Sequence, residues 1–178
     1  LKEKGVSVIS VNYRLSPDAK APAYIEDAAS AVAWTFDNVE KFGGDKSKIF
    51  VSGHSAGGYL ALMVGMDKSY LAKHRIDADS VCGLIPISGQ TITHNAIRAE
   101  NDLAEDIPYV EKYAPLNQLR KMNMPSLLIT GDRRYEINSR FEENQYLESS
   151  LRSKQNEVML YEVQGFNHGT VVSPACLL

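Results

Sequence analysis

The strongest structural signal in the chain is Ile49-Phe50-Val51-Ser52-Gly53-His54-Ser55-Ala56-Gly57-Gly58. Residues 49–52 have the composition of a short buried strand, and the apolar stretch 59–66 after the glycines has that of a helix. A Gly-x-Ser-x-Gly sequence between a strand and a helix predicts a tight, strained turn that lifts the serine hydroxyl clear of the sheet. The residues predicted to form this turn around Ser55 are Gly53, His54, Gly57 and Gly58.

Segments of strand and helix composition alternate along the rest of the chain. Short aliphatic and β-branched runs predict strands at 6–11, 49–52, 81–88, 126–130 and 158–163. Apolar residues at helical spacing predict helices from Pro22 to the Gly43-Gly44 pair, over 59–66 and over 139–154. Strands that alternate with helices favour a mostly parallel sheet flanked by helices, which is an α/β fold.

Length and composition exclude several classes of protein. The chain has 178 residues, of which 44% are hydrophobic and 23% charged, and these values are ordinary for a globular domain. Its formal net charge of -3 gives no sign of the basic surface that nucleic acid would require. No stretch approaches the roughly 18 apolar residues of a membrane span. The two cysteines are too few for a disulfide framework, and no Cys/His spacing is that of a metal site.

One domain over residues 1–178 is the simplest division of the chain. Residues 89–125 interrupt the alternation, and we expect them to pass over the sheet edge as a segment that lines a pocket. The chain opens without a Met in front of the 6–11 strand and stops where a helix begins, so both ends are expected to be cuts in a longer protein. A cytoplasmic, periplasmic or secreted location therefore stays open.

A serine nucleophile needs a base within hydrogen-bond reach. His168 lies in Gly165-Phe166-Asn167-His168-Gly169, after the last predicted strand and at the carboxyl edge where open α/β sheets place their sites. We therefore predict Ser55 as nucleophile and His168 as general base, with the N–H of Ala56 facing the oxyanion. His54 is expected to point away from the serine, and His94 is expected at most to line a pocket.

The base needs an orienting acid, which in this chain order should follow the strand at 126–130. The loop there is Gly131-Asp132-Arg133-Arg134-Tyr135-Glu136 and offers two carboxylates. Asp132 is the favoured acid and Glu136 the alternative. Each could instead be a solvated charge or a helix N-terminal acid.

Three motifs together resemble α/β-hydrolase esterases related to hormone-sensitive lipase and to bacterial acetyl esterases. They are Val11-Asn12-Tyr13-Arg14-Leu15-Ser16-Pro17, Gly53-His54-Ser55-Ala56-Gly57-Gly58 and Gly165-Phe166-Asn167-His168-Gly169. The resemblance covers nearly the whole chain. It implies the α/β-hydrolase fold and hydrolysis of small carboxylic esters through an acyl-enzyme, without a metal or organic cofactor. Some members of such families cleave acetyl groups from carbohydrates, feruloyl esters or the amide of formylkynurenine.

The chain departs from these families in two places. They usually carry the acid three residues after the loop glycine, where this chain has Arg134. They also carry an oxyanion-hole loop of the His-Gly-Gly type on a strand that precedes the Asn-Tyr-Arg strand and separates it from the nucleophile strand. That strand has no counterpart here, so we expect a gap in the sheet beside residues 6–11 and poor anchoring of that segment.

Three hypotheses for function follow. The leading one is a serine esterase that acts on short-chain acyl or acetyl esters, including those on carbohydrates. The second is amide hydrolysis of the arylformamidase type by the same residues. The third is a non-catalytic binding domain that retained the fold.

Overall fold

The computed structural model describes residues 1–177. Its strands are β1 (Phe50–His54), β2 (Gly83–Ile87), β3 (Ser126–Gly131) and β4 (Val158–Val163). Its α-helices are α1 (Ala23–Asn38), α2 (Ala56–Met66), α3 (Lys68–Ala72), α4 (Asn95–Glu100), α5 (Arg140–Ser153) and α6 (Val172–Ala175). Short 3-10 helices occupy Lys2–Lys4, Val39–Phe42, Lys46–Lys48, Ala78–Ser80 and Pro115–Gln118.

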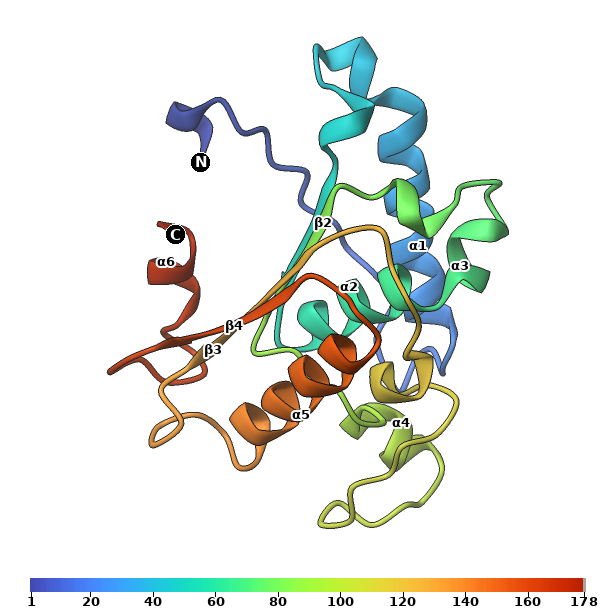
Figure 1. Cartoon of the computed structure of the whole chain (residues 1–178). Coiled ribbons are helices and arrows are strands. Elements are labelled where there is room, and N and C mark those ends of the chain that lie inside the picture. Colours follow the sequence, from blue (N-terminus) through green and yellow to red (C-terminus); the bar gives the residue numbers. More distant parts are fainter. Residues whose placement is uncertain (178) are drawn as a thin grey trace.

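The four strands form one parallel sheet in the order β1-β2-β3-β4, with helices beside it (Figure 1). α2 packs on β1 and β2, α5 packs on β3 and β4, and α1 lies against α2 and α3. The main core fills the space between these helices and the sheet, and its fully buried side chains include Leu62, Met63, Leu84, Leu128 and Leu147. The predicted α/β architecture, a parallel sheet flanked by helices, is confirmed.

The opposite face of the sheet is covered more sparsely. A small cluster of Ile87, Ile129, Val163 and Val171 packs there, with Ala175 of α6 against it. Farther from α6, apolar side chains on β1 and β4 are open to solvent: Phe50 is 54% exposed, Met159 57% and Tyr161 42%. Met159, Tyr161 and Val163 share this face because alternate residues of a strand point the same way. Of the three, only Val163 lies within the cluster around Val171.

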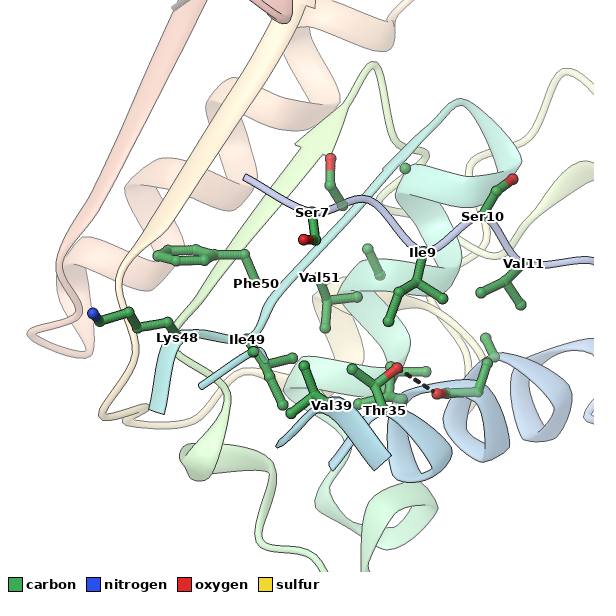
Figure 2. A pocket seen from close by; sticks show the side chains of 18 of the residues that line it. Ser7, Ile9, Ser10, Val11, Thr35, Val39, Lys48, Ile49, Phe50 and Val51 are labelled. Atoms are coloured by element: carbon green, nitrogen blue, oxygen red, sulfur yellow. Dashed lines mark hydrogen bonds between the residues drawn. The ribbon is translucent and has the colours of Figure 1, made fainter. Parts of the chain in front are cut away.

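The strand predicted over residues 6–11 does not form. This segment is extended but lies outside the sheet, and its side chains Val6, Val8, Ile9 and Val11 are each at least 40% exposed. β-branched composition favours extended backbone, but a strand also needs a neighbour that pairs with its N–H and C=O groups. A cavity of about 740 Å³ separates the segment from β1, and Ile9, Val11 and Val51 line it (Figure 2). The expected gap beside residues 6–11 is thus present.

The other predicted elements agree with the structure to within a few residues. α1 begins directly after Pro22, and the turn that follows Val39–Phe42 ends at Gly43 with φ of 79°, in the left-handed region that favours glycine. Residues 89–125 contain only α4 and the 3-10 turn Pro115–Gln118. Within residues 1–177 no helix combines the length and the hydropathy that a membrane span needs.

Candidate active site

The turn between β1 and α2 holds Ser55 in a strained conformation. Ser55 has φ of 56° and ψ of -115°, and its N–H donates to the carbonyl of Ile87 at 2.9 Å. The turn is tight because the backbones of Gly53 and Gly57 touch: a Cβ on Gly53 would lie 2.4 Å from Gly57 carbonyl atoms. Such a conformation of a non-glycine residue is rare and costs free energy, so it is typical of functional positions.

His168 reaches Ser55 from the loop after β4. Its Nε2 lies 2.9 Å from Ser55 Oγ. Asn167 shapes this loop, because its side-chain oxygen accepts from the N–H groups of Gly169 and Thr170, both at 3.0 Å. The structure therefore brings together the serine and the histidine that the sequence predicts.

Glu136 lies on the other side of His168. Its Oε1 is 2.6 Å from His168 Nδ1, and its Oε2 accepts from the hydroxyl of Ser88 at 2.6 Å and from Gly131 N–H at 3.1 Å. The side chain is only 1% exposed. Burial raises the pKa of the Glu136 carboxyl, but the hydrogen bonds from His168, Ser88, Ile137 and Gly131 outweigh it and hold that pKa at about 2. Glu136 is therefore ionised at neutral pH.

Asp132, the acid favoured by the sequence, is not hydrogen-bonded to His168, whereas the alternative Glu136 is. Its carboxylate accepts from Arg134 Nη2 at 2.6 Å and Nε at 2.9 Å, and from Gly165 N–H at 2.8 Å. Its own N–H donates to the carbonyl of Phe166 at 2.7 Å. These bonds, led by the one from the Arg134 guanidinium, keep the Asp132 pKa well below its usual range. Asp132 thus ties the acid loop to the loop that carries His168.

His54 also contacts His168, which the sequence did not predict. His54 Nε2–H donates to the carbonyl oxygen of His168 at 2.7 Å, and the two rings lie 4.7 Å apart. Burial is the main reason that the His54 pKa is lowered, and lowering favours the neutral ring. Residues 54 and 168 are far apart in sequence, so no local pattern could reveal this contact.

A small cavity adjoins the first turn of α2. Its volume is about 60 Å³, and its lining includes Ala56, Tyr13, Tyr24, Tyr59 and His94. The N–H of Ala56 belongs to the first turn of the helix, where backbone donors have no intrahelical partner. His94 lines this cavity, as predicted, and its ring lies 4.8 Å from that of Tyr59.

The described part of the chain contains no group of three or more His, Cys, Asp and Glu side chains arranged to hold a metal ion. The chemistry available at this edge of the sheet is that of a hydrogen-bonded serine, imidazole and carboxylate.

Several of the known proteins that this chain resembles are esterases. Esterase LipC of Mycobacterium tuberculosis is 28% identical over 189 residues, a match that covers 95% of this chain and 46% of LipC. An arylesterase of Saccharolobus solfataricus is 48% identical over 54 residues, 30% of this chain and 18% of the relative. The chain thus spans less than half the length of these curated relatives.

Solved structures show the same fold. An esterase of Pyrobaculum calidifontis superposes with a TM-score of 0.65 at 27% identity, over 90% of this chain and 57% of that one. A solved arylesterase gives a TM-score of 0.70 at 21% identity, over 94% and 61% of the two chains. A sequence model of the BD-FAE family matches residues 1–149. The chain therefore belongs to the BD-FAE family and has the α/β-hydrolase fold of esterases and lipases.

Proposed function

We propose that this chain is the catalytic core of a carboxylic ester hydrolase in which Ser55 is the nucleophile, His168 the general base and Glu136 the orienting acid. The observation that carries the proposal is the continuous hydrogen-bond chain from Ser55 Oγ through both His168 nitrogens to Glu136 Oε1, at 2.9 and 2.6 Å. The esterase relatives support the same chemistry.

The geometry supports one tautomer of His168. An ionised Glu136 can only accept hydrogen bonds, so His168 carries its proton on Nδ1 and donates it to Oε1. Nε2 then carries no proton, and its lone pair faces the hydroxyl of Ser55. That arrangement suits proton abstraction from the serine.

Acylation follows from this arrangement. Ser55 Oγ bonds to the ester carbonyl carbon while its proton passes to His168 Nε2, and the resulting imidazolium is stabilised by Glu136. The carbonyl oxygen becomes an oxyanion facing the Ala56 N–H. When the tetrahedral intermediate collapses, the carbon–oxygen bond to the alcohol breaks and Nε2–H protonates the departing alcohol.

Deacylation repeats the steps with water. His168 Nε2 accepts a proton from water as the water oxygen attacks the acyl carbon, and the proton then returns to Ser55 Oγ as the carboxylic acid leaves. The serine, imidazole and carboxylate end in their starting protonation states. The cycle needs no metal or redox partner, because only protons and the acyl group move.

Short acyl groups are the proposed substrates. The cavity beside Ala56 is small, with a volume of about 60 Å³, so it suits an acetyl or propionyl chain better than a long acyl chain. Its lining is dominated by aromatic and aliphatic side chains, as an acyl chain requires. Acetyl esters, including those of carbohydrates, should therefore be cleaved faster than octanoyl esters of the same alcohol.

Labelling with a fluorophosphonate tests the nucleophile directly, because such probes bond to activated serines. We expect the protein to be labelled and its Ser55→Ala variant to remain unlabelled. Ser52→Ala is the matched control: Ser52 is exposed, on the same strand, and donates only to the carbonyl of Ile85 at 2.7 Å. A folded protein that is not labelled would support the binding-domain hypothesis instead. Equal labelling of Ser55→Ala would show that another serine is activated and would refute Ser55 as the nucleophile.

A further inference from the structure

Ser88 follows β2 and occupies a strained, enclosed position. It has φ of 46° and is fully buried. Its N–H donates to the carbonyl of Ile129 at 2.7 Å, and its hydroxyl donates to Glu136 Oε2 at 2.6 Å. A serine with positive φ is uncommon, and such strain persists only where surrounding contacts determine the conformation.

Contacts from α5 hold this conformation. The carbonyl of Ser88 accepts a hydrogen bond from the guanidinium of Arg140, a residue that is only 4% exposed. The next carbonyl, of Gly89, accepts from Asn144 Nδ2 at 2.9 Å. Two buried side chains of one helix therefore fix the backbone that follows the Ser88 side chain, and the N–H bond to Ile129 fixes the backbone before it. Together these contacts set the direction of the hydroxyl.

The direction of the Ser88 hydroxyl matters because Glu136 has to keep its carboxylate on the imidazole of His168. Its carboxylate has two ends: Oε1 faces His168 and Oε2 faces Ser88. A glutamate has one more rotatable bond than an aspartate, so its carboxylate needs more restraint to stay on the imidazole. The remaining donor to Oε2 is the Gly131 N–H at the longer distance of 3.1 Å.

We propose that Ser88 is a positioning residue for the acid: its hydroxyl anchors Oε2 of Glu136 so that Oε1 stays hydrogen-bonded to Nδ1 of His168. The inference rests on the proposed function of Glu136 and goes beyond it by naming a fourth side chain. Ser88 touches neither Ser55 nor the substrate in this scheme. It acts through Glu136 alone.

Steady-state kinetics of Ser88→Ala and Ser88→Gly test the proposal. Both remove the hydroxyl, and glycine adopts positive φ without strain, so Ser88→Gly keeps the turn if alanine disturbs it. We expect kcat to fall about 10- to 100-fold with KM nearly unchanged, because a charge-assisted hydrogen bond is lost. Ser126→Ala is the matched control, since the Ser126 hydroxyl is also buried but has no partner among the described residues. It should leave kcat within about twofold.

A double-mutant cycle separates positioning from packing. In a Glu136→Gln background, Ser88→Gly should lower the residual kcat less than about threefold, because the residue through which Ser88 acts is already impaired. A purely structural serine would cause the same loss in both backgrounds. An equal loss would overturn the proposal.

Proton NMR of His168 provides a readout that needs no turnover. The Nδ1 proton lies in a 2.6 Å hydrogen bond, and we expect its resonance to shift in Ser88→Gly but not in Ser126→Ala. An unchanged resonance together with unchanged kcat would refute the role of Ser88. A resonance that shifts in Ser88→Gly, in a protein whose Ser55 is not labelled by fluorophosphonate, would uphold the positioning role of Ser88 and refute the esterase function. Failure of the positioning proposal and failure of the proposed function are therefore distinguishable.

Discussion

Replacing the two carboxylates of the acid loop one at a time gives a decisive test of the site. Glu136→Gln keeps the shape of the side chain but removes its charge, so the amide can present an N–H to His168 Nδ1. The imidazole would then accept at Nδ1 and carry its proton on Nε2, facing Ser55 Oγ, which is the wrong tautomer for a base. Asp132→Asn makes the same chemical change four residues earlier, away from the imidazole.

The two substitutions should lower kcat to very different extents. Loss of the orienting carboxylate in serine hydrolases with a triad lowers kcat about 10⁴-fold through the wrong tautomer, and we expect roughly 10³- to 10⁴-fold for Glu136→Gln. Asp132→Asn should change kcat less than about tenfold. It should lower Tm instead, because it weakens the bonds to Arg134 and Gly165 that join two loops.

Hydrolysis of p-nitrophenyl acetate, with Tm measured on the same samples, checks both expectations. Circular dichroism confirms that each variant is folded before its rate is compared. A folded Asp132→Asn that loses a thousandfold in kcat, beside a Glu136→Gln that keeps most of its activity, would refute the assignment. The acid would then be Asp132, and the contacts described for Glu136 would be structural.

Three further predictions concern the turn, a buried histidine and the first segment. Gly53→Ala should abolish folding and labelling, because its Cβ would lie 2.4 Å from backbone atoms, whereas Gly57→Ala meets nothing within 4 Å and should fold. Burial lowers the His94 pKa from 6.5 to about 4, so the unfolded chain binds a proton on this histidine more readily than the folded protein does. The free energy of unfolding should therefore fall by at most about 3 kcal/mol as the pH drops through this range. Urea melts at several pH values measure this dependence, and His94→Asn should flatten it. Amides of residues 7–11 should exchange with deuterium within seconds, while those of β3, in the middle of the sheet, stay protected; protection of 7–11 would contradict the unpaired state.

Local composition predicts most of this fold but not the partners of its elements. β4 was expected at 158–163 and lies there, because its aliphatic run is bounded by polar turns and paired along β3. The run at 6–11 has similar composition, yet it lies outside the sheet. Whether a β-branched segment becomes a strand depends on a neighbour in space, and no property of the segment itself reveals one.

The site shows the same limit at finer scale. Ser55 and His168 could be predicted because each lies in a glycine-rich turn directly after a strand. His54 and Ser88 could not, since their partners come from distant loops. The two acids were both recognised, but the choice between them depended on how five loop residues fold. The one local signal was Arg134, two residues after Asp132 and able to pair with it.

The electrostatics of the two carboxylates are consistent with separate tasks for them in the proposed mechanism. Asp132 is paired with a guanidinium, so much of its charge is already compensated and little remains to stabilise an imidazolium. Glu136 accepts instead from a hydroxyl, from backbone N–H groups and from the imidazole itself, none of which carries a full positive charge while His168 is neutral. In the proposed mechanism, the positive charge that forms when His168 takes the proton of Ser55 therefore meets, at 2.6 Å, a buried carboxylate that is not paired with a guanidinium. The arginine at the position where related esterases place the acid thus supports the triad indirectly: it pairs with Asp132 and leaves Glu136 as the carboxylate that faces His168.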